Sequence, residues 1–315
     1  MKRNPKALFV ALLVTRVLLS SALADDAKPK PEKAPPLPLH TIDGVGGVVI
    51  TPIAYLVNPG PEKEVFGLPS ISGTFVGAGQ KNVQSFGLTE TLWRRVELGY
   101  AASRFGLGNF PTAVQAATTV DIGRSDVWLH NLNARVLALP ENSFNLPLPA
   151  LTIGAQFKIN DGINDIDKKL GGAITGVGLN SNVGGDFVLT ASKLFPKLGF
   201  GRPVIISGGV RVSNAAWGGY VGFQKDFPVT FEGNVVWLIH DRIALAAEYR
   251  QYPNPYGTIT VGGSQLLRSE DDWFTAGVAF VLDKHTTLTA GYGHFGALLN
   301  TVENAGWAVS AKYEF

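Results

Sequence analysis

The chain has 315 residues, of which 45% are hydrophobic and only 17% are charged, with 37 glycines and no cysteine. The missing cysteine excludes a disulfide scaffold, a thiolate metal site and a cysteine nucleophile. The formal net charge of +2 leaves no basic excess, so nucleic acid is not an expected partner. The length suits one large all-β unit or two ordinary domains, and abundant glycine favours turns and crowded sheets over helices.

Residues 1–24 have the pattern of a secretory signal peptide. A positively charged start precedes an apolar stretch at residues 7–19, and Ala22 and Ala24 form a small-residue cleavage site. A permanent anchor is the alternative, but the stretch is short for a span and contains Arg16. We therefore expect export through the inner membrane and cleavage after Ala24.

Residues 25–38 (DDAKPKPEKAPPLP) are rich in proline and charge. This composition predicts an extended periplasmic leader between the signal peptide and the rest of the chain. Cleavage removes four basic residues and no acidic one, so the mature chain is slightly acidic. Residues 39–315 form the third predicted unit.

After residue 38, segments of about ten residues alternate apolar and polar side chains, which indicates strands. In the segment 149–160, Ile153 and Phe157 fall on one face while Gln156 and Lys158 fall on the other. No apolar stretch long enough for a transmembrane helix follows residue 38. A soluble sandwich shows the same alternation, so further features must decide which side of the sheet meets lipid.

Three features favour a membrane barrel. The polar faces are rich in small Gly, Ser and Thr residues, as expected for the inside of a barrel. Aromatic residues cluster near segment ends, as in an interfacial girdle. They are Trp93, Trp128, Phe187, Phe195, Trp217, Trp237, Trp273, Phe280, Phe295 and Trp307. The third feature is the C-terminus.

The chain ends in an alternating segment whose last residue is aromatic. The apolar face consists of Trp307, Val309, Ala311, Tyr313 and Phe315. This segment resembles the C-terminal sorting signal of bacterial outer-membrane barrels, which the barrel-insertion machinery recognises. The resemblance implies a Gram-negative outer membrane, with secretion and insertion machinery as partners during biogenesis and outer-membrane lipid afterwards.

The predicted fold is an all-β, transmembrane, antiparallel up-and-down barrel of about 12 strands, with 10–14 possible. The expected strands are 47–56, 82–91, 94–104, 125–139, 149–160, 184–195, 202–213, 217–226, 242–251, 272–282, 286–295 and 306–315. Both ends of the barrel chain then lie in the periplasm, and the stretches 161–183, 252–271 and 296–305 lie outside the cell. Residues 70–77 and 229–239 also alternate, and counting both as additional strands would give fourteen.

Residues 41–58 (TIDGVGGVVITPIAYLVN) and the terminal barrel signature together resemble a family of Gram-negative outer-membrane proteins catalogued as a domain of unknown function. A more distant likeness is to barrels associated with exopolysaccharide secretion. It rests on residues 47–54, on Ala191, Ser192 and Lys193, and on residues 245–249 (LAAEY). The first resemblance implies an outer-membrane barrel, and the second implies a role with a surface polymer.

Charged residues in the polar phase of the predicted strands are expected to line the lumen. They are Arg95, Glu97, Arg135, Lys158, Arg211, Glu232, Arg242, Glu248 and Arg250. Rings of such charges select ions in porins. Both signs occur here, so pairing across the lumen is the alternative, and we weight it above selectivity.

Enzymatic and metal chemistry have little support. His130 and His294 are candidate rim bases for a lipid-modifying enzyme, but no G-x-S-x-G elbow is present. A loop offers oxygen ligands for Ca²⁺ without the spacing of an EF-hand. Its residues are Asp161, Asn164, Asp165 and Asp167. We expect neither a catalytic site nor a cofactor, and we expect a solvated acidic loop rather than a metal site.

The predicted function is a channel or facilitator for small solutes. The alternative is a non-conducting barrel that assists the export or assembly of a surface polymer such as exopolysaccharide. A rim-located lipid-modifying enzyme is the third hypothesis.

Overall fold

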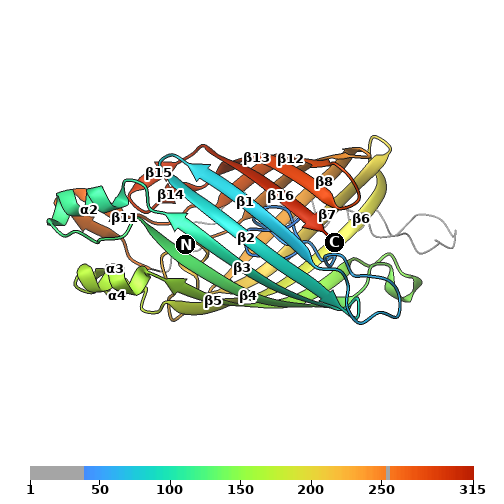
Figure 1. The fold of residues 1–315 in the computed structure, drawn as a ribbon, viewed down its shortest axis with the longest axis horizontal. Coiled ribbons are helices and arrows are strands. Elements are labelled where there is room, and N and C mark those ends of the chain that lie inside the picture. Colours follow the sequence, from blue (N-terminus) through green and yellow to red (C-terminus); the bar gives the residue numbers. More distant parts are fainter. Residues whose placement is uncertain (1–38, 253–255) are drawn as a thin grey trace.

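Twelve strands close into an antiparallel barrel in the order β1-β16-β13-β12-β9-β8-β7-β6-β5-β4-β3-β2 (Figure 1). The computed structural model describes residues 39–252 and 256–315, so the predicted signal peptide and leader lie outside the described residues. Strand β1 closes the cylinder by pairing with β16 from Ser70↔Glu314 to Ala78↔Gly306. The predicted number of strands is confirmed, and closure leaves no strand edge unpaired in hydrocarbon.

The barrel strands run along the chain as follows: β1 (Ser70–Ala78), β2 (Lys81–Leu92), β3 (Val96–Gly106), β4 (Asp126–Leu139), β5 (Ala150–Asp161), β6 (Val183–Gly199), β7 (Arg202–Ser213), β8 (Val229–His240), β9 (Ile243–Arg250), β12 (Trp273–Val281), β13 (Thr286–His294) and β16 (Gly306–Glu314). Barrel strands that follow one another in sequence are neighbours in the sheet, which is an up-and-down arrangement closed by the pairing of β1 with β16.

The connections contain the remaining elements: α2 (Phe110–Thr118), η2 (Ser143–Asn145), α3 (Ile163–Lys169), α4 (Ala173–Gly176), η3 (Ala216–Gly219), the hairpin of β10 (Ile259–Val261) with β11 (Ser264–Leu267), and the hairpin of β14 (Gly296–Leu298) with β15 (Thr301–Glu303). Among residues 39–252 and 256–315, no helix is long and apolar enough to cross a membrane.

The two ends of the barrel differ in the length of their loops. The long connections, which carry α2, α3, α4, η3 and both hairpins, lie at the end opposite the C-terminus (Figure 1). The C-terminal end has tight turns, such as β2–β3, where Trp93 and Arg94 both have positive φ (49° and 59°), as a type I′ turn requires. Outer-membrane barrels have short periplasmic turns and long extracellular loops, so the C-terminal end is periplasmic.

The outer face of the barrel is apolar and the inner face polar. In β5, the side chains of Ile153 and Phe157 are 58% and 48% exposed, whereas Thr152 and Lys158 are fully buried. The last strand follows the same rule, with Trp307, Val309, Ala311, Tyr313 and Phe315 outside and Lys312 inside. A soluble sheet buries its apolar face, so this inverted pattern fits a barrel that spans the outer membrane.

Two predicted strands are wrong. Residues 47–56 do not enter the sheet but lie inside the barrel, and residues 217–226 form η3 and a buried loop. Gly218, Gly219 and Gly222 have positive φ, which breaks an extended strand there. The two alternating segments 70–77 and 229–239 form β1 and β8 in their place, which is why the total remains twelve.

The aromatic residues fall into two groups. Trp93, Phe187 and Trp307 are exposed on the outside, as a girdle requires. Trp217 and Phe295, with Trp273, are buried inside and so do not belong to the girdle. They fill the space beneath the extracellular loops, where their area covers the top of the lumen.

Candidate functional site

A single segment at the start of the described chain, residues 39–57, occupies the lumen. We call it the plug. Every residue from 39 to 54 is buried, although none belongs to the barrel sheet. Part of its backbone pairs within the plug, as where the N–H of Ile42 donates to the carbonyl of Val49 over 2.9 Å. Buried backbone groups are rarely left unpaired, and charged and polar side chains of the inner face bind further groups of the plug backbone.

Glu248 of β9 binds three successive backbone N–H groups of the plug. Val49, Ile50 and Thr51 donate to its carboxylate over 3.0, 2.9 and 2.7 Å. The hydroxyl of Thr51 donates to the same carboxylate over 2.7 Å, and Thr275 of β12 donates over 2.6 Å. One carboxylate thus satisfies a turn of the plug that no neighbouring strand could pair.

A second carboxylate, Glu97 of β3, binds the plug at two positions, Gly46 and Val57. Gly46 and Val57 donate their N–H groups to it over 3.1 and 2.9 Å. Arg135 of β4 binds Glu97 through two contacts of 2.9 and 2.6 Å and donates to the carbonyl of Ile53 over 2.7 Å. This bidentate pair fixes the plug from the donor and the acceptor side together.

A buried ion network lies beside the plug. Its members are the cations Lys158, Arg211 and Arg250 and the carboxylates Asp43, Asp186 and Glu232. Asp186 is its centre, 2.9 Å from Lys158 and 2.6 Å from Arg211. Asp43 belongs to the plug and lies 3.5 Å from Lys158 and 3.3 Å from Arg250. Three charges of each sign make the network neutral, which is the condition for burying them together.

Polar side chains hold the remaining plug backbone and His40. His40 Nδ1 is 2.8 Å from the Ser72 hydroxyl, and its other ring nitrogen contacts Thr89. Asn131 and Asn133 both donate to the carbonyl of Asp43, over 3.1 and 2.6 Å. These side chains thus add polar contacts between the wall and the plug.

The three short motifs of the polysaccharide-barrel resemblance meet at the plug. Residues 47–54 form its deepest part, and Glu248 of the motif 245–249 binds it as described. Ser192 of the second motif accepts the N–H of Ala54 over 2.7 Å. These motifs are distant in sequence but form one contact surface between the plug and the wall.

Seven of the nine predicted lumen charges lie buried inside the barrel: Glu97, Arg135, Lys158, Arg211, Glu232, Glu248 and Arg250. Arg95 and Arg242 do not. They are exposed at the β2–β3 and β8–β9 turns, where each donates to a carbonyl of the next hairpin, that of Leu137 (3.2 Å) or Leu282 (3.5 Å). The alternation of apolar and polar residues continues past the ends of β3 and β9. It therefore does not show that Arg95 and Arg242 lie in the turns just before these strands.

Sequence reasoning missed two residues of the network. Asp186 shares its strand face with Thr190, in the polar phase of the predicted segment 184–195. The alternation therefore predicts that the side chain of Asp186 points inward. Asp43 is the only acidic residue between positions 39 and 57. Its role depends on the plug's course through the lumen, which local alternation does not encode.

The acidic loop does not assemble into a cation site. Asp165 pairs with Arg124, and Asp167 accepts N–H groups at the start of α4 over 2.7 and 3.1 Å. Asp161 and Asn164 are exposed. Among the residues that the structure describes, no group of three metal-ligating side chains comes together.

The two candidate rim histidines face away from the lumen serines. His130 Nδ1 is 2.7 Å from the Tyr100 hydroxyl on the outer face, and His294 Nδ1 is 3.2 Å from the carbonyl of Asn304. Ser103 faces inward and donates to Ser85 over 2.8 Å. Opposite strand faces thus separate His130 from Ser103, the geometry least suited to a nucleophile and its base.

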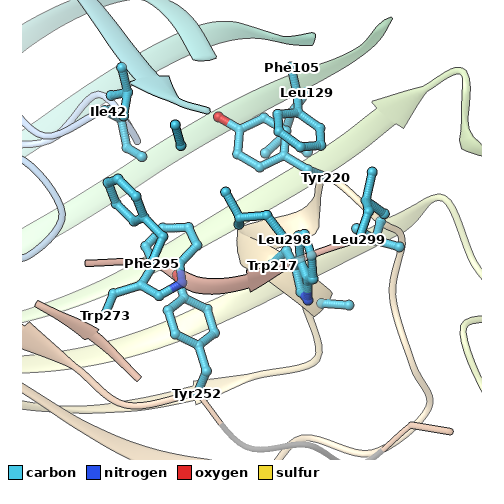
Figure 2. Close-up of a cluster of buried hydrophobic side chains, with 14 of the residues drawn as sticks. Ile42, Phe105, Leu129, Trp217, Tyr220, Tyr252, Trp273, Phe295, Leu298 and Leu299 are labelled. Atoms are coloured by element: carbon cyan, nitrogen blue, oxygen red, sulfur yellow. The ribbon is translucent and has the colours of Figure 1, made fainter. Parts of the chain in front are cut away.

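The extracellular loops close the barrel with a buried cluster of aromatic and aliphatic side chains. Figure 2 shows Trp217, Tyr220, Trp273 and Phe295 grouped between Ile42 of the plug and the β14–β15 turn. The rings of Trp273 and Phe295 are 5.2 Å apart in an edge-to-face arrangement, and Tyr252 packs on Trp273 at 4.6 Å. Two apolar cavities, of ≈ 60 and ≈ 110 Å³, remain next to this cluster.

A buried carboxyl in the β11–β12 connection makes this cap sensitive to pH. Trp217 donates its backbone N–H to Glu270 and its indole N–H to the Tyr256 hydroxyl (2.6 Å). Burial raises the pKa of Glu270 well above its ordinary value of 4.5. The folded state therefore favours the neutral acid, and the stability this contributes is present at low pH and lost as the pH rises through the raised pKa.

We expect hydrogen exchange in residues 214–224 to show the cap opening more readily as the pH rises from 4.5, after correction for the intrinsic exchange rate. Glu270→Gln, which is neutral and similar in shape, should remove this dependence. Asp161→Asn, at an exposed acid of the same barrel end, is the control. An equal pH dependence in Glu270→Gln would assign the effect to another group.

Comparison with known structures returns outer-membrane barrels. The KdgM porin has 10% sequence identity and a TM-score of 0.47, and the match covers 78% of this chain and 99% of that one. The Acinetobacter baumannii outer membrane protein Omp33 has 7% identity and a TM-score of 0.42 (80% and 100% covered). The Pseudomonas putida toluene transporter TodX has 9% identity and a TM-score of 0.41 (88% and 98% covered).

No curated protein matches the chain. A family profile described as "Protein of unknown function (DUF3034)" matches residues 38–312. The match covers the plug and the barrel strands as far as residue 312 of β16. The protein therefore belongs to the DUF3034 family.

Proposed function

We propose that this protein is a facilitator that carries small solutes through the outer membrane, and that the plug closes its lumen until the plug moves. The observation that carries this proposal is the way in which residues 39–57 fill the lumen. They are bound there by hydrogen bonds and ion pairs and by no covalent link within the described residues. Such contacts exchange with water at modest net cost, so a plug held by them can leave.

The charges of the inner wall support this reading in a specific way. Glu97, Arg135 and Glu248 bind the plug backbone, and Glu97 and Arg135 also bind each other. The sequence favours pairing between such charges over ion selectivity, and the proposal adds the plug as a further partner. When the plug leaves, the same groups face water, which is the polar lining that a solute channel needs.

The cysteine-free chain allows a direct test of plug movement. A Cβ atom built at Gly44 of the plug lies 3.0 Å from the Cβ of Ala101 on β3, close to the separation of about 3.5–4.5 Å in disulfides. We therefore expect Gly44→Cys with Ala101→Cys to form a disulfide that ties the plug to the wall. Solute flux and conductance of the purified barrel in planar bilayers should be low when oxidised and rise on reduction.

The single variants Gly44→Cys and Ala101→Cys, treated with the same oxidant and reductant, control for local strain and for the reagents. Gly44 has a φ of 78°, so a side chain there carries some strain in both redox states. Equal, measurable flux in the oxidised and reduced double variant would contradict a plug-gated path.

A non-conducting barrel that serves a surface polymer is the second candidate, because the neutral ion network and the plug together fill the lumen. This candidate predicts no conductance in either redox state. It also predicts that deletion of the gene alters the surface polymer without changing solute uptake.

A further inference from the structure

We propose that the solute is a small apolar molecule, captured in an apolar pocket beneath the extracellular loops and passed to the lumen beside Tyr220. This inference rests on the proposed function and names the class of solute. It starts from the two cavities, which lie in series along the barrel.

The outer pocket has a volume of ≈ 110 Å³ and an apolar wall. Separate loops build it: Phe110 comes from α2, Ile163 and Ile166 from α3, Ile174 from α4 and Leu266 from β11. Among its described lining residues only Thr118 and Tyr220 carry a polar side-chain atom, and the Thr118 hydroxyl donates to the carbonyl of Val114. A polar solute would lose its hydration there without finding partners, which disfavours its binding.

The size of the outer pocket sets the size of the ligand. An apolar cavity of about 150 Å³ in a protein stays free of water and binds benzene or xenon. The ≈ 110 Å³ pocket falls in the same range, so it suits a single aromatic ring or a short hydrocarbon. A charged solute would meet the desolvation cost without an opposite charge in the wall.

The inner cavity, of ≈ 60 Å³, lies between the plug and the cap. The apolar side chains of the plug, such as Ile42 and Ile50, form one side of it. The opposite side is a part of the barrel wall with very small residues, where Gly277 of β12 pairs with Gly291 of β13. The barrel members of the ion network lie on β5 to β9, so β12 and β13 contribute none of them, although Glu248 of β9 and Lys81 of β2 also line the inner cavity.

Tyr220 lines both cavities and is buried. Its ring packs on Phe105 at 5.3 Å, and Figure 2 shows both rings at the edge of the cluster that faces Ile42. The neighbouring Gly219 and Gly222 have φ values of 112° and 103°, so the loop that carries Tyr220 is built on glycine conformations. A change in the position of this one side chain would join the outer pocket to the inner cavity.

The inner cavity is too small for a ring while the plug is in place. An apolar solute that passes Tyr220 therefore competes with Ile42 and Ile50 for contact with the small residues of β12 and β13. Its burial there would replace apolar contacts that Ile42 and Ile50 lose when the plug moves. This links capture of the solute to movement of the plug.

The experiment is a methyl NMR titration with benzene, with pyrazine as a polar ring of the same shape. The full protein is labelled at isoleucine δ1 methyl groups and placed in lipid nanodiscs. Ile163, Ile166 and Ile174 report on the outer pocket, and Ile153 on the lipid-facing surface controls for partition of benzene into lipid. We expect the pocket methyls to shift saturably with benzene and by less than a tenth as much with pyrazine.

A matched pair of variants localises the binding. Ala173→Phe places a ring in the outer pocket, and Ala116→Phe places the same ring on the exposed face of α2. Ala173→Phe should weaken the benzene response at least tenfold, and Ala116→Phe should leave it unchanged. The comparison of benzene with pyrazine in the wild type does not depend on either variant folding.

Two results would overturn the inference: pocket methyls that only follow the linear response of Ile153, or an equal response to benzene and pyrazine. These results are separate from those of the disulfide test. Flux of polar solutes without benzene binding would leave the facilitator standing and reject the apolar class. Benzene binding with no flux in either redox state would leave the pocket standing and reject the facilitator.

Discussion

Asp186→Asn is expected to destabilise the folded barrel by about 3–5 kcal/mol, the usual cost of removing one partner from a buried ion pair. Asp186 is fully buried, 2.9 Å from Lys158 and 2.6 Å from Arg211, and it also accepts from the Ser213 hydroxyl over 2.5 Å. The amide removes one negative charge, so three cations would share two carboxylates away from water. The lower stability should appear as a lower temperature at which the folded band is lost in heat-modifiable gel migration.

Two control variants test whether the loss of stability comes from the buried charge imbalance. Asp226→Asn changes an exposed carboxylate and should leave the transition unchanged. Asp186→Asn combined with Lys158→Met restores neutrality, and part of the lost stability should return. A single variant as stable as the wild type would show that water reaches the network and that the lumen is not dry there.

Glu248→Ala is expected to release the plug while the barrel stays closed. The substitution removes the acceptor of three plug N–H groups and of the Thr51 hydroxyl. An orphaned buried donor costs about 1–3 kcal/mol, so three of them favour the released plug by roughly a hundredfold or more. Hydrogen exchange of residues 49–51 should accelerate accordingly, and conductance should rise above that of the wild type.

The disulfide supplies the decisive control for this variant. In the oxidised Gly44→Cys, Ala101→Cys background, Glu248→Ala should lose its added conductance, because the plug remains tied to β3. Glu64→Ala, at an exposed glutamate of the segment before β1, should have no effect. Faster exchange without added conductance would mean that the plug loosens but another part of the chain keeps the lumen closed.

The barrel could be predicted because the alternation of apolar and polar residues shows, within each strand, which side chains point outward and which point inward. In β5, Ile153 and Phe157 are outward and Lys158 inward, as the two-residue period requires. The C-terminal strand behaves in the same way from Trp307 to Phe315. A strand's two faces are set by its own backbone, so the alternation follows from the chain itself. The identity of the strands did not, because two of the twelve predicted strands were wrong and β1 and β8 took their place.

The site was predicted only in part. Seven inward charges follow from the phase of their strands, but the pattern could not fix where a strand ends, and Arg95 and Arg242 fell at turns. The choice between pairing across the lumen and ion selectivity also stayed open. The partners of these charges include the backbone of residues 39–57, and the alternation of side chains carries no information about such backbone contacts.

The plug is the feature that only the tertiary structure decided. Residues 47–56 are apolar enough for a strand, yet they lie in the lumen. Backbone N–H groups can donate either to a carbonyl of a neighbouring strand or to a carboxylate of the wall, and Glu97 and Glu248 come within reach of them only once the barrel has closed. The sequence by itself determined which faces meet lipid and that the sheet closes; long-range contacts decided what fills it.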